Sequence, residues 1–248
     1  MLATSQTTAR LVDGQSRYGW LAASLRARIT QGEWAPGTAL PAESALAREQ
    51  GVALGTMRQA IALLVSEELL ERQHGRGTFV RAGLGGASML RFFRFRQSDD
   101  LAQVPASRIL KRRVRLASRE IADALGQSAG SSVLELLRLR SLGGQPCLLE
   151  RIWLALPACE ALVQSDTAAW DDLLYPMIQR VCGVTIHKAE DALSFGLLTA
   201  GQARHLKLQP GHPCVQVDRR AFDIGGRCTE LRTTLGDAHA FHYKLSIH

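Results

Sequence analysis

The chain has 248 residues, of which 46% are hydrophobic and 21% are charged, and its formal net charge is +7. This composition is typical of a soluble globular protein with one or two domains, and it excludes a disordered or membrane-embedded chain. The positive charge favours a polyanionic partner such as nucleic acid, although many basic proteins bind none.

The N-terminus lacks the apolar core and flanking positive charge of a secretory signal, and no run approaches the roughly 18 apolar residues of a membrane span. We therefore expect a cytoplasmic protein with no membrane partner. Five cysteines are widely spaced without a Cys-x-x-Cys pair: Cys147, Cys159, Cys182, Cys214 and Cys228. We interpret them as free thiols in a reducing compartment rather than as a metal or redox centre.

Residues 17–67 are predicted to form three helices. Apolar residues recur near a 3.6-residue period from Trp20 to Ile29, and Gly32 ends this first helix. A short second helix begins at Glu43, whose carboxylate suits the positive end of a helix. The run LGTMRQAIALLVSEEL predicts a third, longer helix.

The third helix is the candidate DNA-reading element. Thr56, Arg58 and Gln59 project from its first turns, away from its apolar side. An arginine near the start of a helix in the major groove can contact guanine through two hydrogen bonds. Thr56 and the backbone N–H groups at the helix start suit a phosphate. The alternative is that Arg58 is an ordinary solvated side chain.

Two short strand-like runs follow, one on each side of His74 to Gly77, which is the pattern of a β-hairpin. Three helices followed by a hairpin predict a winged helix-turn-helix domain over residues 14–81. The Gly-rich segment AGLGGAS at residues 82–88 is predicted to be a flexible linker.

Strand-like runs dominate the rest of the chain, residues 89–248. These runs are ILKRRVRLAS, SSVLELLRLRSL, QPCLLERIWLAL, HPCVQVDRRAFD and RCTELRTTL. Helical stretches lie between them: SREIADALG, WDDLLYPMIQRVCG and TAGQARHLKL. The mixture predicts a second, α+β domain with a largely antiparallel sheet.

Strand alternation predicts a charged pocket in this second domain. In VLELLRLR, Arg138 and Arg140 share a face with two leucines and could grip a carboxylate or phosphate. Glu150 lies on an apolar face of the next run, where a carboxylate needs an arginine or a bound ligand as partner. The alternative is a purely structural ion pair between Arg138 and Glu150.

The run RFFRFR at residues 91–96 also alternates. Phe92, Arg94 and Arg96 fall on one face, where the two arginines could add positive charge at the pocket mouth. The alternative is an amphipathic edge strand with solvated arginines. The histidines show no metal-ligand spacing, so we expect neither a metal nor another cofactor.

Residues 18–81 resemble the DNA-binding domain of the GntR superfamily of bacterial transcription regulators. The resemblance is carried by the ordered pieces PGTALPAESALA, GVALGTMRQAI and GRGTFV. It implies DNA contacts from the start of the second helix, the first turn of the third helix and the wing hairpin. The corresponding residues here are Glu43, Ser44, Thr56, Arg58, His74, Gly75, Arg76 and Gly77.

The chain departs from this family where Ser-Arg is replaced by Ala53 and Leu54. The change removes a serine that would cap the third helix and an arginine that would contact DNA. The other matching residues are present, so we expect DNA binding with an altered or relaxed sequence preference.

Residues 89–247 resemble the UTRA effector-binding domain of the HutC subfamily, which shares its fold with chorismate lyase. The ordered pieces are SREIADALG, VLELLRLRSLGGQPCLLERIWL, DLLYP, ARHLKLQPGHPCVQVDRRAF and CTELRTTLGDAHAFHY. The resemblance implies that Arg138, Arg140, Glu150 and Glu230 line the effector cavity. Tyr243 is a further candidate.

These patterns predict a ligand-responsive transcription regulator, most simply a repressor. It would bind a double-stranded DNA operator with an inverted repeat as a homodimer. The effector would be a small anion, such as an organic acid, amino-acid derivative or sugar phosphate. Its binding would change the spacing of the two DNA-reading helices and release the protein from the operator.

The alternative function is a small-molecule enzyme of the chorismate-lyase-like fold. We expect no catalytic residue, because no nucleophile–base arrangement is evident. The length of the chain argues against an attached aminotransferase-like domain. The many strand-like runs argue against a helical effector domain.

Overall fold

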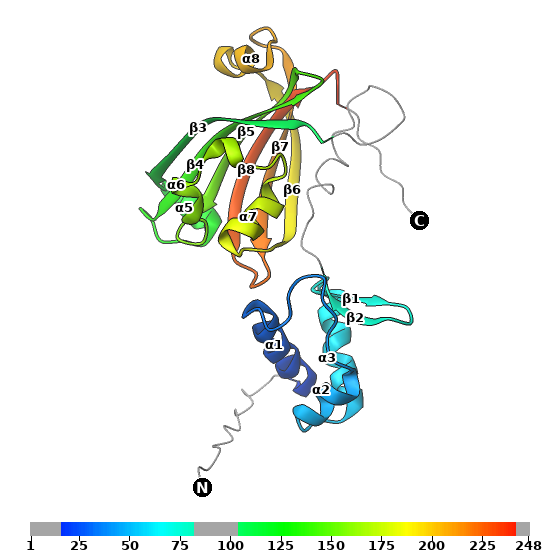
Figure 1. The fold of residues 1–248 in the computed structure, drawn as a ribbon. Coiled ribbons are helices and arrows are strands. Elements are labelled where there is room, and N and C mark those ends of the chain that lie inside the picture. The colour runs from blue at the N-terminus through cyan, green and yellow to red at the C-terminus, as the bar shows by residue number, and fades with distance from the viewer. Residues whose placement is uncertain (1–15, 82–103, 242–248) are drawn as a thin grey trace. The chain divides into compact units, whose positions relative to one another are not determined.

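Three helices and a β-hairpin begin the computed structural model, which describes residues 16–81 and 104–241 (Figure 1). The elements of this first part are α1 (Arg17–Thr30), α2 (Glu43–Glu49), α3 (Leu54–Ser66), β1 (Leu70–Gln73) and β2 (Gly77–Val80). The strands pair in antiparallel register. This is the order of elements that the sequence predicts for a winged helix-turn-helix.

One apolar side of each helix forms the core of this unit. The fully buried side chains include Leu21, Leu25, Leu46, Met57, Ile61 and Leu64. Ser16 caps α1 by accepting a hydrogen bond from the backbone N–H of Gly19 at 3.2 Å. Gly32, just beyond the end of α1, has a φ of 83°, which glycine adopts without strain. The predicted end of the first helix is therefore confirmed.

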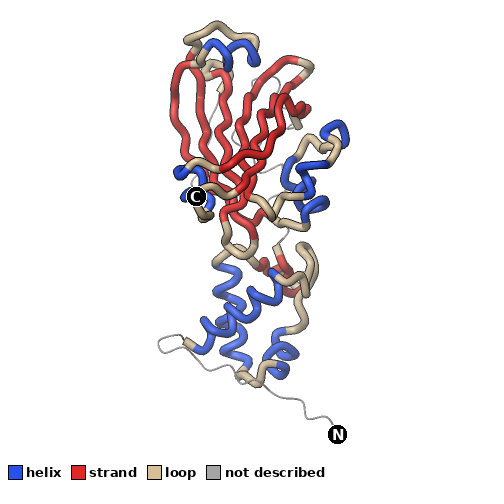
Figure 2. Tube along the Cα trace, turned by 90° about the vertical axis from the view of Figure 1, so that its left-hand side faces the viewer, coloured by secondary structure: helices blue, strands red, loops and turns tan. Residues whose placement is uncertain are grey.

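A six-stranded antiparallel sheet forms the centre of the second unit (Figures 1 and 2). Its strands are β3 (Ala106–Leu116), β4 (Ser132–Leu142), β5 (Gln145–Ala155), β6 (Ile186–Leu197), β7 (Pro213–Asp223) and β8 (Cys228–Asp237). Their order in the sheet is β3-β4-β5-β8-β7-β6. Two three-stranded meanders therefore meet where β5 pairs with β8. The α+β class with an antiparallel sheet is confirmed.

Short helices cover both faces of this sheet. They are α5 (Arg119–Leu125), α6 (Ala161–Gln164), the 3-10 turn η1 (Thr167–Ala169), α7 (Leu174–Cys182) and α8 (Ala200–Leu206). On one face, Tyr175 and Ile178 of α7 pack with Leu136 and Ile152. We call this the arginine face, because Arg138, Arg140 and Arg232 alternate onto it.

The other face of the sheet is covered by α5 and α8. Leu206 of α8 packs with Leu149 and Leu235, while Leu125 of α5 packs with Val133. Glu135, two residues further along β4, belongs to this side. We call it the groove face.

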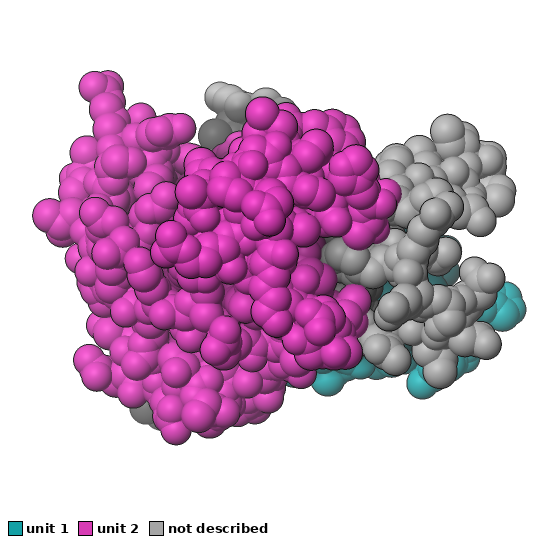
Figure 3. Space-filling model, turned by 90° about the horizontal axis from the view of Figure 1, so that it is seen from above, with its two compact units in different colours: residues 1–82 teal, residues 83–248 magenta. Residues whose placement is uncertain are grey.

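The chain divides into two compact units, residues 1–82 and 83–248, which Figure 3 colours separately. The predicted linker at 82–88, the arginines Arg94 and Arg96, and Tyr243 lie outside the described residues. In the part of the chain that is described, no helix has the length and apolar character needed to cross a membrane.

One strand was missing from the sequence-based prediction. The run HKAEDALSFGLL forms most of β6, which pairs with β7 from Ile186 opposite Asp223 to Leu197 opposite Pro213. The run is charged in its first half and poor in β-branched residues, so its local preference for a strand is weak. Its conformation is set by pairing with β7.

Candidate effector site and DNA interface

Two of the predicted DNA-contacting residues form an exposed ion pair on the first unit. Arg58 of α3 donates from Nε to Glu43 Oε2 of α2 at 3.0 Å. Arg72 of β1 brings its Nη2 to within 3.5 Å of Glu43 Oε1. The side chain of Arg58 is 62% exposed. Exposed ion pairs of this kind contribute only about 0–1 kcal/mol, so a DNA phosphate or base can compete for the arginine.

The other predicted DNA contacts also reach the surface. Ser44, Gln59, His74, Gly75, Arg76 and Gly77 are exposed, and Thr56 is half-buried. Gly75 and Gly77 at the wing tip have φ values of 72° and 113°, which favour glycine. The Arg76 guanidinium carbon lies 5.5 Å from the centre of the Phe79 ring. The wing therefore offers a cation at an exposed tip.

The start of α3 lacks a side-chain cap. Ala53 occupies the N-cap position, and its carbonyl accepts hydrogen bonds from Thr56 and Met57 at 3.0 and 3.2 Å. Leu54, the first helical residue, is 37% exposed. An apolar pair thus stands where the sequence resemblance implies polar DNA-facing side chains.

The second unit buries an ion pair on the arginine face. Arg138 and Glu150 are direct cross-strand partners in β4 and β5. The Nε of Arg138 donates to Glu150 Oε2 at 2.5 Å, and the two side chains are only 2% and 1% exposed. Strand alternation predicts the face of each residue within its own strand, and the register of β4 with β5 brings Arg138 and Glu150 together.

Arg232 of β8 is the main residue that sequence reasoning missed. Its Nε donates to Glu230 Oε1 at 2.6 Å, and its Nη1 lies 3.4 Å from Glu150 Oε1. Its guanidinium carbon lies 5.4 Å from the centre of the Tyr175 ring. Glu150 is therefore held between two arginines. The sequence contains a pattern that could have identified Arg232, because residues two apart in a strand point to the same face, as Glu230 and Arg232 do.

The arginine face retains unused hydrogen-bond donors. Arg140 donates from Nη2 to the carbonyl oxygen of Pro105 at 2.7 Å. The buried atoms Arg138 Nη2 and Arg140 Nε have no hydrogen-bond partner among the described residues. A buried donor without an acceptor costs about 1–3 kcal/mol, so these two atoms mark a place where an acceptor would be stabilising.

The charge cluster continues toward the far edge of the sheet. Arg219 of β7 donates from Nε to Asp191 Oδ1 of β6 at 2.6 Å, and its Nη1 lies 3.4 Å from the hydroxyl of Tyr175. Four buried guanidinium groups thus share the arginine face with three carboxylates: Arg138, Arg140, Arg219 and Arg232 with Glu150, Glu230 and Asp191. The cluster keeps one net positive charge, which favours an anion.

Burial and the neighbouring arginines act in opposite directions on Glu150. Burial alone would raise the pKa of this carboxyl, but Arg138, Arg232 and Arg140 hold it at about 2. Burial lowers the pKa of Arg140, and the adjacent Arg138 and Arg232 add to that effect. An incoming anion would relieve this repulsion between like charges.

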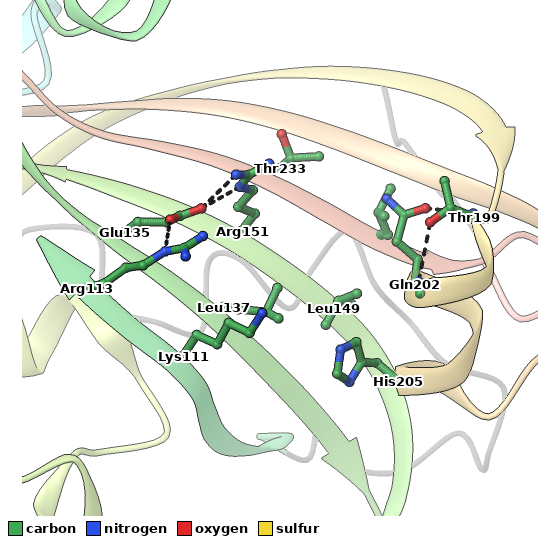
Figure 4. Close-up of a pocket in the computed structure, with 12 residues that line it drawn as sticks. Lys111, Arg113, Glu135, Leu137, Leu149, Arg151, Thr199, Gln202, His205 and Thr233 are labelled. Carbon is green, nitrogen blue, oxygen red and sulfur yellow. Dashed lines mark hydrogen bonds and ion pairs between the residues drawn. The ribbon is translucent and has the colours of Figure 1, made fainter. Parts of the chain in front are cut away.

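An open groove of about 410 Å³ lies on the groove face and contains none of the predicted effector residues (Figure 4). Glu135 accepts hydrogen bonds from Arg113 Nε at 2.6 Å and from Arg151 Nη2 at 2.7 Å. Both arginines are about half exposed. The other polar side chains that line the groove are Lys111, Thr199, Gln202, His205 and Thr233 (Figure 4). Since Glu135 pairs with arginines from both sides, this groove has the character of a solvated ion-pair cluster.

Two histidines of the second unit, His212 and His239, make polar contacts near the end of β8. The Nε2 of His212 lies 2.7 Å from Asp237 Oδ1, and its ring centre lies 5.2 Å from that of His239. Across residues 16–81 and 104–241, no group of three or more His, Cys, Asp or Glu side chains is arranged to hold a metal ion.

Comparison with known proteins identifies both units. Residues 100–242 match the UTRA domain, and residues 17–80 match the gntR family of bacterial regulatory proteins. The HTH-type transcriptional repressor NagR of Bacillus subtilis is 28% identical over 88% of this chain and 90% of its own length. The mannosyl-D-glycerate transport/metabolism system repressor MngR of Escherichia coli is 28% identical over 86% and 88%.

The fold of the second unit is similar to that of a solved domain. This is the ligand-binding domain of a protein described as a GntR-family transcriptional regulator from Bordetella bronchiseptica. The TM-score is 0.58 and the sequence identity is 28%, over 62% of this chain and 94% of that one.

Proposed function

Because the chain belongs to the gntR family of bacterial regulatory proteins and carries a UTRA domain, we propose that it is a repressor that leaves its operator when a small anion binds on the arginine face. Its relatives are transcription regulators rather than enzymes. The observation that carries the proposal is the pair of buried donors, Arg138 Nη2 and Arg140 Nε, in a cluster with one net positive charge.

The cluster favours an effector that combines an anionic group with hydrogen-bonding groups. The guanidinium donors suit a carboxylate or phosphate, and the buried carboxylate of Glu230 suits a hydroxyl or amino group. The relative MngR is named for mannosyl-D-glycerate, which joins a carboxylate to sugar hydroxyls. These features support an organic acid, an amino-acid derivative or a sugar phosphate as the class of effector.

In this proposal residues 14–81 form the DNA-binding domain, residues 82–88 form a linker, and residues 89–248 form the effector-binding and dimerisation domain. The protein acts in the cytoplasm as a homodimer on an inverted repeat. Both reading helices must meet their half-sites together, so a change in their spacing forfeits the avidity of the dimer. For effective release, the effector must favour the non-binding arrangement by several kcal/mol, on the order of 5.

DNA reading is tested by fluorescence anisotropy with DNA from just upstream of the protein's own coding region, in the presence of random competitor DNA. Arg58→Ala should remove tight binding, because one specific arginine contact discriminates by about 1–3 kcal/mol. Arg26→Ala is the matched control. It removes the same charge from the same unit, but Arg26 pairs with Glu67 at the opposite end of α3.

Effector binding is tested by a thermal-shift screen of sugar phosphates, sugar acids and amino acids. Active anions are then added to the protein–DNA complex. Arg140→Gln should abolish the shift, whereas Arg151→Gln on the groove face should keep it. An anion that still stabilises Arg140→Gln but not Arg151→Gln would move the effector site to the groove and refute the assignment to the arginine face.

A further inference from the structure

Leu54 is an exposed apolar side chain on the helix that the proposed function places against DNA. It is 37% exposed and Tyr18 of α1 is 40% exposed, whereas the other large apolar side chains of residues 16–81 are more buried. Leu54 and Arg58 lie four residues apart in α3, so their side chains are neighbours on one face of the helix. Apolar surface gains free energy when it leaves water, so an apolar group on the DNA would be a stabilising partner for Leu54.

The residue that follows Leu54 leaves room for such a partner. Gly55 is exposed, and a Cβ added to it would lie in open space, so packing within the unit does not require glycine there. Glycine is a poor helix former, and it is used where the backbone must approach a ligand closely. The first turn of α3 is therefore shaped so that a flat base edge can come close to Leu54.

Thymine is the base that offers an apolar group in the major groove. The edges of adenine, guanine and cytosine show only hydrogen-bond donors and acceptors there, whereas thymine adds its C5-methyl group. A leucine side chain has neither a donor nor an acceptor. Placed against guanine or cytosine, it would take water from polar atoms and give no hydrogen bond in return, which is unfavourable. Contact with the thymine methyl group avoids that cost.

We propose that Leu54 contacts the C5-methyl group of one thymine in each half-site of the operator. This inference rests on the proposed function and names one base that the protein recognises. In helix-turn-helix proteins the N-terminal residues of the recognition helix contact the base edges. Leu54 is the first residue of α3, and Arg58 follows about 6 Å further along the helix axis. Because base pairs stack about 3.4 Å apart, the thymine should lie roughly one or two base pairs from the base that Arg58 contacts.

The test uses the full chain and an operator that it selects from random DNA. Thymines of this operator are replaced by deoxyuridine, one position at a time and in both half-sites. Deoxyuridine lacks only the C5-methyl group and keeps every hydrogen-bonding group of thymine. Fluorescence anisotropy should show, at one position, a loss of affinity of about 4-fold per half-site, as expected for one buried methyl group, and thus of about 15-fold for the whole operator.

Four variants assign the lost affinity to one side chain. Leu54→Ala should bind the thymine and deoxyuridine operators equally, because alanine is too short to reach the methyl group. Leu54→Met keeps an apolar side chain of similar length and should retain the sensitivity. Gln59→Ala is the matched control, because it shortens another exposed side chain of α3 and should leave the sensitivity unchanged. Leu54→Arg should select guanine at the same position, since arginine can donate two hydrogen bonds to guanine.

Two results would overturn the inference: a wild type that is insensitive to deoxyuridine at every position, or a sensitivity that Leu54→Ala retains. The selection with Leu54→Arg remains decisive if Leu54→Ala binds too weakly to measure, because an unchanged base preference would also refute the contact. Specific binding that needs Arg58 but no thymine methyl group would keep the regulator and refute only the role of Leu54. A wild type that selects no sequence would refute the proposed function and this inference together.

Discussion

Each of the two units contains an ion pair between an arginine and a glutamate, which is exposed in the first unit and buried in the second. Arg58 and Glu43 in the first unit, and Arg138 and Glu150 in the second, are both joined through the arginine Nε, at 3.0 and 2.5 Å. The arginine side chains are 62% and 2% exposed. The exposed pair can exchange its partner for a DNA phosphate at little cost. The buried pair is fixed, so it can hold a binding surface in one shape.

The largest change in stability is expected when the carboxylate is removed from each ion pair in turn. Glu150→Ala should destabilise the second unit by about 3–5 kcal/mol, because it leaves buried arginines uncompensated. Glu43→Ala should change stability by about 1 kcal/mol or less. Equilibrium urea unfolding followed by circular dichroism measures both. Equal losses in the two variants would mean that burial does not distinguish the pairs.

The second test uses pH. The pKa of Glu150 is held at about 2, below its ordinary value of 4.5, so its charge stabilises the folded state fully above pH 4.5. This contribution is lost as the pH falls from 4.5 through 2, and it amounts to about 3 kcal/mol. Urea unfolding at pH 5 and pH 3 should show a steeper loss for the wild type than for Glu150→Gln, which cannot titrate there. Parallel losses would show that Glu150 does not carry the effect.

The smallest change in stability is expected at the start of α3 in the first unit, where the helix has no side-chain cap. Ala53→Ser supplies a side-chain oxygen for a free helical N–H, so it should stabilise this unit by about 0.5–2 kcal/mol. Thermal unfolding measures the gain. Thr56→Ser serves as a control, because it alters a hydroxyl-bearing residue in the same turn without adding a cap. A gain of equal size in the control would show that capping is not the cause.

Periodicity explains which parts of the fold and the site could be predicted. Alternation along the strands suffices to put Arg138 and Arg140 on one face and Glu150 on an apolar one, because the period of a strand fixes the face of each residue. The same pattern cannot say which strands become neighbours. Arg232 comes from a strand 82 residues further along the chain than Glu150, and only the pairing of β5 with β8 brings them together.

The first unit was easier to predict, because its elements are local. Helical spacing, Gly32 and the glycines at the wing tip mark its elements within short stretches of sequence. The partnership of Arg58 with Glu43 was still not predicted. It depends on how α2 and α3 pack, and no local pattern reports that.

The meeting of two meanders at β5 and β8 has a consequence for how the second unit folds. Within each meander the strands that pair follow one another in the chain, whereas the joint between the meanders closes a long loop. Forming that joint has a large entropic cost, so it should be the slow step. Until then Glu150 and Arg232 lie on separate halves, where water can still solvate both. The charge cluster that defines the arginine face is therefore completed only as the last large piece of the sheet docks.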